Sequence, residues 1–261
     1  MESSNNEHLF ETFDTKYGKV TLYKNEMYIG GTFKENRYWD EHTLLKLKPY
    51  INPNRNILEI GGHCGTSSLV YSSYLKEGKK LFVYEAQENM YKLLVRNIHQ
   101  NNLDEKIIPH HLGVFCYNGL GAMNIYALDG GGGEISKRYN EEHEIGCNFG
   151  GLCLGQSGEN MQMTTVDSME LDDIGFIHCD AQGSENFIFS EATKTIEKYR
   201  PFILYENQDF TGNYLFDRVV YSYSAYLENS KFNIKDYCMS KLNYTGYIDR
   251  FNGGHDTLLI P

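Results

Sequence analysis

Apolar residues in this chain form short runs separated by polar stretches, and most of these runs have the length of one buried strand. The runs that predict strands lie at 56–60, 80–85, about 107–115, 161–166, 174–179, 202–206, 232–238 and 256–260. Stretches with helical spacing lie at about 39–51, 64–76, 89–101 and 214–228. This alternation predicts an α/β fold in which helices cover both faces of a mostly parallel sheet.

Two parts of the chain stand outside this alternation. Residues 1–50 are expected to form an N-terminal extension, with a polar and disordered start at 1–8, a hairpin at 17–33 and a helix. Residues 51–261 form the main domain, and within it the glycine-rich stretch 129–160 has no periodicity. A loop of that length is usually functional or disordered, so it is either a cover on the acceptor side of a site or a surface insertion.

The most informative stretch is NILEIGGHCGTSS, which begins at Asn56. It predicts a strand, a glycine turn and a helix, with the form E-x-G-x-x-x-G from Glu59 through Gly61 to Gly65. Glycine lets a backbone approach a ligand closely, and His63 belongs to a residue type that is enriched at positive φ. An acid before the glycines would repel a pyrophosphate but can accept a hydrogen bond from an ammonium group. The turn therefore favours S-adenosylmethionine over a dinucleotide.

A second acid supports this interpretation. The next strand, LFVYE, ends at Glu85, where a carboxylate can accept hydrogen bonds from both ribose hydroxyls of a nucleoside. The expected cofactor-binding residues are Glu59, Gly61, Gly62, His63, Gly65, Thr66, Ser67, Glu85, Ala86, Gly113, Val114 and Asp180. The alternative is a glycine turn that only connects a strand to a helix.

Further acids follow two later strands. Asp180 ends the strand at 174–179, and Glu206 and Asn207 end the strand RPFILYEN. The carboxyl ends of parallel strands meet at one edge of the sheet, which is where α/β proteins bind ligands. Hard cations prefer such oxygen ligands, so Asp180, Glu206 and Asn207 are candidate ligands for Mg²⁺. The alternatives are that Asp180 contacts the methionine end of the cofactor, and that Glu206 only shapes its strand end.

Composition narrows the class of partner. The formal net charge is −11, from 24 basic and 35 acidic residues, which argues against a nucleic-acid partner. The six cysteines show no metal-ligand spacing. The first thirty residues do not resemble a signal peptide, and no apolar run approaches the roughly 18 residues of a membrane span, so we expect a cytoplasmic chain without membrane insertion.

Taken in order, these motifs resemble the FkbM-type methyltransferases. The matching pieces are GGHCG from Gly61, YEAQ with Glu85, DAQGSE from Asp180, RPFILYE ending at Glu206, and the closing DTLLIP. The chain departs from the family pattern at His63, Gln182 and His178, which stand where Asn, Glu and Lys are usual. Gln182 removes one acid from the region near the expected methyl group.

The resemblance implies a Rossmann-like class I methyltransferase fold, with a seven-stranded sheet and S-adenosylmethionine as cofactor. It also implies O-methylation of a hydroxyl on a sugar, glycan or other small molecule. The candidate catalytic residues are Asp180, Glu206 and His255, whereas we expect His178 to be a core histidine. Two alternatives stay open: a methyltransferase of protein or nucleic acid, and a degenerate protein that binds the cofactor or serves a structural role. A homo-oligomer is compatible with the sequence.

Overall fold

A seven-stranded sheet forms the centre of the computed structural model, which describes residues 7–124, 146–156, 158–207 and 226–261. Its strands, in chain order, are β3 (Asn56–Ile60), β4 (Leu81–Glu85), β5 (Ile107–His111), β10 (Ile174–Cys179), β11 (Phe202–Glu206), β12 (Gly246–Ile248) and β13 (Asp256–Ile260). Across the sheet the order is β12-β13-β11-β10-β3-β4-β5. β13 runs antiparallel to both of its neighbours, and the other strand pairs are parallel. The mostly parallel sheet predicted from the sequence is therefore present.

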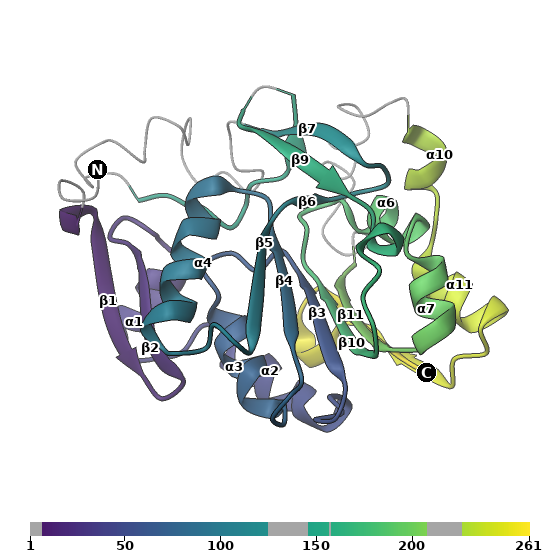
Figure 1. The fold of residues 1–261 in the computed structure, drawn as a ribbon, viewed down its shortest axis with the longest axis horizontal. Coiled ribbons are helices and arrows are strands. Elements are labelled where there is room, and N and C mark those ends of the chain that lie inside the picture. Colours follow the sequence, from purple (N-terminus) through teal and green to yellow (C-terminus); the bar gives the residue numbers. More distant parts are fainter. Residues whose placement is uncertain (1–6, 125–145, 157, 208–225) are drawn as a thin grey trace.

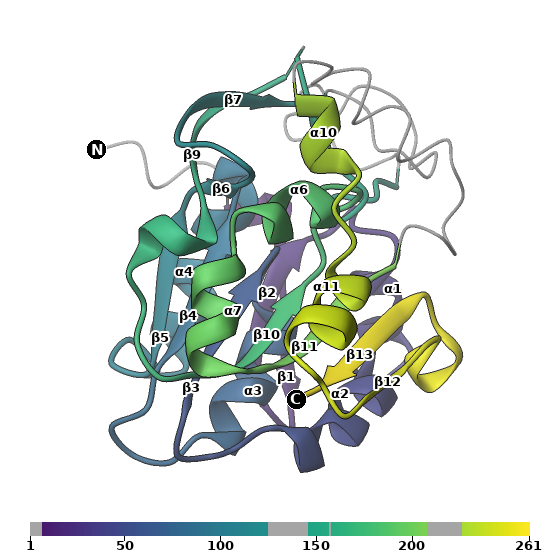
Figure 2. The ribbon, with the colours of Figure 1, turned by 90° about the vertical axis from the view of Figure 1, so that its right-hand side faces the viewer.

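Helices cover both faces of this sheet (Figures 1 and 2). The helices α2 (Glu41–Leu47), α3 (Thr66–Tyr74) and α4 (Glu88–Gln100) lie on one face, and α6 (Glu185–Ser190), α7 (Thr193–Tyr199) and α11 (Ile234–Lys241) lie on the other. Adjacent strand residues divide between two separate cores: Ile57 and Phe176 pack with the first helix layer, and Leu58 and Ile177 with the second. Strands buried on both faces explain the continuous apolar runs in the sequence.

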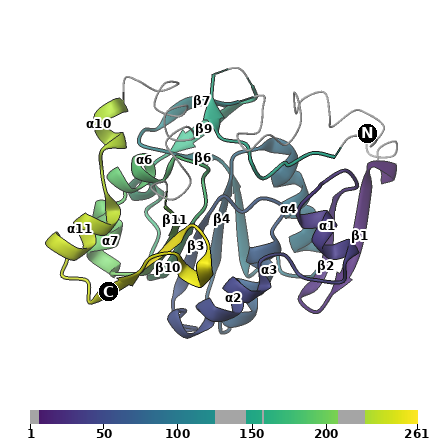
Figure 3. The ribbon, with the colours of Figure 1, turned by 180° about the vertical axis from the view of Figure 1, so that it is seen from behind.

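The N-terminal extension is a hairpin followed by short helices, seen beside α4 in Figure 3. After a 3₁₀ turn at Glu7–Leu9, β1 (Phe10–Thr15) pairs with β2 (Gly18–Tyr23), and α1 (Ile29–Lys34) follows. The hairpin expected at 17–33 therefore turns earlier, and the second half of that stretch is helical. Asn97 of α4 fixes the hairpin, because its amide bonds both the N–H (2.7 Å) and the carbonyl (3.0 Å) of Thr21.

A smaller sheet of four strands lies beyond the carboxyl end of β5 (Figure 1). It contains β6 (Gly113–Val114), β7 (Gly119–Met123), β8 (Leu154–Gly155) and β9 (Asn160–Thr164), in the order β6-β9-β7-β8. The single strand predicted at about 107–115 is divided between β5 of the large sheet and β6 of this one, the strand predicted at 161–166 corresponds to β9, and β7 and β8 were not predicted. The described part of the glycine-rich stretch continues from this sheet to the N-terminal extension, where the N–H of Cys147 donates to the carbonyl of Asn25 (2.8 Å).

The region after β11 differs most from expectation. The strand predicted at 232–238 is wrong, because α11 occupies Ile234–Lys241 and Asn233 caps it by accepting a hydrogen bond from the N–H of Asp236 (3.0 Å). A local cap of this kind outweighs a weak apolar alternation.

Most of the helix expected at 214–228 lies outside the described residues, as does 1–6, and α10 spans Leu227–Ser230. Short 3₁₀ helices lie at Lys48–Tyr50, Val166–Met169 and Phe251–Gly253. None of the described helices is long and apolar enough to cross a membrane.

Candidate functional site

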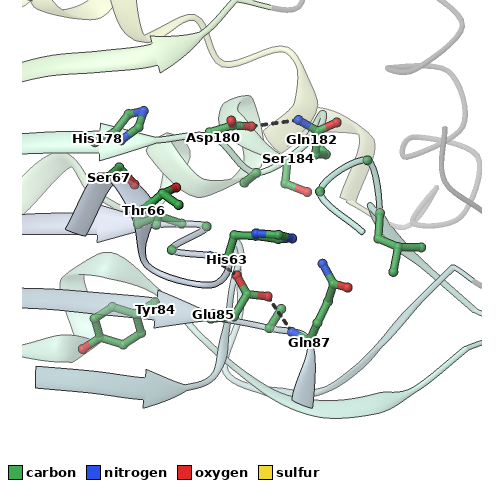
Figure 4. A pocket seen from close by; sticks show the side chains of 18 of the residues that line it. His63, Thr66, Ser67, Tyr84, Glu85, Gln87, His178, Asp180, Gln182 and Ser184 are labelled. Atoms are coloured by element: carbon green, nitrogen blue, oxygen red, sulfur yellow. Dashed lines mark hydrogen bonds between the residues drawn. The ribbon is translucent and has the colours of Figure 1, made fainter. Parts of the chain in front are cut away.

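A cavity of about 420 Å³ opens at the carboxyl ends of β3, β4 and β10 (Figure 4). That volume lies within the range of ligand pockets in proteins, roughly 300–1,000 Å³. The predicted cofactor-binding residues that line it are Gly61, Gly62, His63, Thr66, Ser67, Glu85, Ala86, Gly113, Val114 and Asp180. The strand-end rule therefore located a real cavity, and two predicted residues, Glu59 and Gly65, do not line it.

The glycine turn is shaped by its protein neighbours. Gly61 has φ of +85°, and a Cβ placed there would lie 1.9 Å from the backbone oxygen of Asp180. Gly65 has φ of +90°, and its Cβ would lie 2.8 Å from Leu94 of α4. His63 has φ of 48°, as its residue type suggested. The glycines are thus required for packing between strand ends and helices, rather than only for approach to a ligand.

Glu85 is a buried carboxylate at the wall of the cavity. It is 4% exposed, and its two oxygens accept hydrogen bonds from the backbone N–H groups of His63 (2.7 Å) and Gln87 (2.8 Å). Burial raises the pKa of Glu85 to about 7, although these two hydrogen bonds lower it. Each carboxylate oxygen has a second lone pair, so Glu85 can still accept two hydrogen bonds from a ligand.

The His63 ring extends into the cavity between Glu85 and Ser184 (Figure 4). Both ring nitrogens are buried, and neither has a hydrogen-bond partner among the described residues. Burial lowers the pKa of His63 to about 4, so the ring is neutral near pH 7 and offers one donor and one acceptor. Buried polar atoms normally have partners, so these two nitrogens indicate a polar ligand in the cavity.

Glu59 has a different place from the one we expected. Its side chain is fully buried beneath the cavity, and its carboxylate accepts hydrogen bonds from the hydroxyls of Ser67 and Ser68 at the start of α3. Its Oε1 also lies 3.8 Å from Nδ1 of His178. Because the serine hydroxyls hold this carboxylate against α3, it fixes the glycine turn to the sheet.

The expected metal site is assembled in part. One oxygen from each of Asp180, Glu185 and Glu206 lies within 4.8 Å of the others, so the structure adds Glu185 to the two predicted acids. Glu185 also accepts hydrogen bonds from the N–H groups of Ala181 (2.8 Å) and Gly183 (3.1 Å). The amide nitrogen of Asn207, the third predicted ligand, donates to the hydroxyl of Thr257 (3.1 Å).

Gln182 holds the two predicted acids together. Its amide nitrogen lies 2.8 Å from Oδ1 of Asp180 and 3.3 Å from Oε2 of Glu206. Asp180 lines the cavity, whereas Glu206 does not. The amide of Gln182 thus donates to both acids.

His255 and His178 both lie in places that differ from our expectation. His255 is exposed and does not line the cavity. His178, which we expected in the core, lines the cavity, and its Nδ1 lies 3.2 Å from the hydroxyl of Tyr71. Burial lowers the pKa of His178, but the carboxylates of Glu59, Asp180 and Asp256 together more than offset this, so the net direction is upward.

Several lining residues were missed by the sequence analysis. Trp39 and Asp40 come from the extension, and Asp256 comes from the start of β13. Asp256 could have been found, because an antiparallel strand begins at the edge where its parallel neighbour ends, and Asp256 pairs with Glu206. The described part of the glycine-rich stretch also lines the cavity, through Asn148, Gly150, Gly151, Leu152 and Leu154.

Numbered along the chain, the seven strands of the large sheet have the order 3-2-1-4-5-7-6, and the last strand is antiparallel to its neighbours. This order, with helices on both faces, agrees with the Rossmann-like fold and seven-stranded sheet that we expected.

No protein-family model matches the sequence, and no curated protein matches it. Among solved structures, the chain is similar to the methyltransferase FkbM from Methylobacillus flagellatus, with 13% identity and a TM-score of 0.47. That match covers 80% of this chain but only 44% of the Methylobacillus chain. An O-methyltransferase from Bacillus cereus, determined with S-adenosylhomocysteine (SAH), has 16% identity and a TM-score of 0.45, with 84% and 79% of the two chains covered. The O-methyltransferase TomG from Streptomyces achromogenes, determined with S-adenosylmethionine, has 13% identity and a TM-score of 0.44, with 84% and 77% covered. These similarities concern the fold.

Proposed function

We propose that this protein is an S-adenosylmethionine-dependent O-methyltransferase that acts on a hydroxyl of a sugar, a glycan or another small molecule. One observation carries the proposal. Glu85 is buried at the wall of the cavity, directly beside the glycine turn, with both oxygens fixed by backbone N–H groups. A carboxylate held in this way can bind both hydroxyls of a ribose.

The cavity walls fit the parts of this cofactor. Glu85 would hold the ribose, and the apolar surface of Ala86, Leu112 and Val114 would hold the adenine. The neutral ring of His63 would donate to and accept from polar groups of the cofactor, which would satisfy its two buried nitrogens. Thr66 and Ser67, at the start of α3, lie where the amino-acid end would be bound. When bound, the cofactor supplies an electrophilic methyl group.

Methyl transfer forms a bond between the acceptor oxygen and the methyl carbon and breaks the bond between that carbon and sulfur. The protein aligns the acceptor, and this positioning supplies much of the rate. Asp180 lines the cavity and would accept the proton that leaves the hydroxyl. Gln182 would keep that carboxylate in place by its 2.8 Å hydrogen bond.

A Mg²⁺ ion bound by Asp180, Glu185 and Glu206 forms a second part of the proposal. Three carboxylates with oxygens within 4.8 Å supply the ligand type that Mg²⁺ prefers. Gln182 would have to turn its amide oxygen toward the ion, since its nitrogen now donates to two of these acids.

The direct test is incubation with S-adenosylmethionine and a panel of sugars, glycans and hydroxylated small molecules, followed by mass spectrometry. We expect one class of acceptor to gain the mass of one CH₂ with the wild-type protein and not with Glu85→Gln. Methylation of proteins or nucleic acids alone would select the alternative acceptor class. Cofactor binding without methyl transfer to any acceptor would select a binding protein.

A further inference from the structure

Acids dominate the charge of the cavity wall. Glu26, Asp40, Glu85, Asp180 and Asp256 line the cavity, and no lysine or arginine does so in the part of the chain that the structure describes. An anionic acceptor such as a phosphate ester or a carboxylic acid would enter against this charge, and the imidazole of His178, already beside the carboxylate of Glu59, is the one lining group among the described residues with a raised pKa that could pair with it. The charge therefore selects for a cationic occupant.

Two of these acids already have partners within the protein. Glu26 accepts hydrogen bonds from the backbone N–H groups of Tyr28 (3.2 Å) and Gly30 (2.5 Å). Glu85 accepts from His63 and Gln87 in the same way. Asp256 differs from these two, because its carboxylate accepts no hydrogen bond from any described residue although it is half-buried.

Hydrogen bonds join the start of α2 to the turn that precedes β13. The hydroxyl of Thr43 donates to Oδ1 of Asp40 (2.6 Å), and the amide of Asn252 donates to the hydroxyl of Thr43 (3.0 Å). Asp256 begins the strand that follows Asn252. The start of α2 and the start of β13 thus present two carboxylates to one cavity.

An independent observation indicates a polar ligand in the cavity. Ser184 is 1% exposed and lines the cavity on the turn that follows Asp180 (Figure 4), yet its hydroxyl has no hydrogen-bond partner among the described residues. A buried hydroxyl costs free energy when it is left unpaired. Its partner is expected to be a polar group of a bound molecule.

Two aromatic side chains also line the cavity. Trp39 and Tyr28 line it and remain 37% and 44% exposed, respectively. An exposed aromatic face beside a carboxylate can bind the apolar face of a sugar ring or a cation. Trp39 precedes Asp40 directly, so ring and charge would contact the same ligand.

We propose that the acceptor is a hydroxylated ring that carries a protonated amine, that is, an amino sugar or a related aminated polyol, and that Asp40 and Asp256 bind its ammonium group. This inference rests on the proposed methyltransferase function. The cofactor does not exhaust the negative charge, because a sulfonium, an ammonium and a carboxylate leave it with one net positive charge. The acceptor amine is the anchor, and a hydroxyl of the same ring receives the methyl group.

The test is calorimetric titration of the SAH-bound protein with three sugars of matched shape: glucosamine, N-acetylglucosamine and glucuronic acid. We expect glucosamine to bind about 10- to 100-fold more tightly than N-acetylglucosamine, the size of a charge-assisted hydrogen bond, and glucuronic acid to bind most weakly. Asp256→Asn and Asp40→Asn should each reduce this preference. Asp104→Asn, which removes an exposed aspartate paired with His99, should leave it unchanged.

The outcomes separate the two levels of the proposal. If the protein binds SAH but glucosamine binds no better than the neutral sugar, or if the preference survives both aspartate variants, the cationic acceptor is overturned and the methyltransferase function stands. If SAH itself does not bind, the proposed function fails first. Unfolding temperatures of the variants in SAH show that any loss is local to the acceptor end.

Discussion

Gly61, the residue after β3, lies directly against the backbone oxygen of Asp180. A Cβ on Gly61 would be only 1.9 Å from that oxygen. The N–H of Asp180 also donates to the carbonyl of Ile60 (3.0 Å). The two strand ends that frame the proposed methyl-transfer region are thus joined by backbone contact. Because this contact leaves no room for a side chain, the position of Asp180 depends on a glycine in the neighbouring turn.

Gly61→Ala tests this contact. The substitution should destabilise the fold by more than the roughly 1–2 kcal/mol that a positive φ costs an L-residue, because the backbone of Asp180 must also move. Gly78→Ala is the matched control, since Gly78 also has positive φ (+78°) but nothing lies within 4 Å of its added Cβ. Denaturant unfolding measures both losses. Equal losses for the two variants would show that the contact has no energetic weight.

Asp256 gives the folded protein a dependence on pH. Burial raises the pKa of Asp256 from 3.8 to about 7, the negative charges of Asp180 and Asp40 add to this, and His178 opposes it. Because the pKa is higher in the folded state than in the unfolded one, the stabilising effect of this group is full below about pH 3.8 and is lost progressively as the pH rises to about 7.

Asp256→Asn should therefore raise the unfolding temperature most at about pH 8, by less at about pH 5, and little at about pH 3.5. Thermal unfolding of both proteins across that range measures the difference. A constant difference between them at all pH values would show that Asp256 ionises at its ordinary pKa.

The turn at Asn148 supports the wall of the cofactor pocket. Oδ1 of Asn148 accepts hydrogen bonds from the N–H groups of Gly150 (3.0 Å) and Gly151 (3.1 Å), and the carbonyl of Phe149 accepts one from the amide of Gln87 (3.0 Å). Asn148→Ala should loosen this wall and weaken SAH binding by a factor of about 5 to 10, the value of one or two neutral hydrogen bonds. Calorimetry measures it, and Asn54→Ala in a distant exposed turn is the control. Unchanged affinity would place this segment outside the cofactor pocket.

Gln182 decides how strongly the acidic cluster binds a cation. We expect Mg²⁺ to bind at Asp180, Glu185 and Glu206, and Gln182→Glu to bind it at least about tenfold more tightly, because a fourth carboxylate replaces an amide that now donates to two acids. Titration of each protein with MgCl₂ after treatment with EDTA gives the two affinities. The site is absent if neither protein binds the ion, or if Glu206→Gln leaves binding unchanged.

The sequence predicted the large sheet well because buried strands have a strong and local signal. β3, β4, β10, β11 and β13 lie within one residue of the predicted runs, and the acids at their ends predicted the edge at which the cavity opens. The signal failed where a local feature competed with it, as at Asn233, whose cap begins a helix in a stretch that we expected to be a strand.

The cavity was predicted only in part, because its wall also contains residues from segments that are distant in the sequence from the predicted strand ends. Trp39 and Asp40 do not follow a predicted strand. They line the cavity because α2, which begins directly after them, packs against the 3₁₀ helix at Phe251–Gly253. Glu59 had the expected spacing but a different partner, because the hydroxyls of Ser67 and Ser68 reach it first. Spacing along a strand predicts which edge a side chain occupies, and it cannot predict which neighbour will bind that side chain.

The most direct measurement of the central claim is calorimetric titration of SAH into the wild-type protein, Glu85→Gln and Glu88→Gln. Glu88 is the matched control, because it is an exposed acid near Glu85 that pairs with Lys92 and does not line the cavity. We predict that the wild type and Glu88→Gln bind SAH equally, and that Glu85→Gln binds it more weakly by about 1–3 kcal/mol. Equal binding by all three proteins, or no binding by the wild type, would contradict the assignment of this cavity to S-adenosylmethionine.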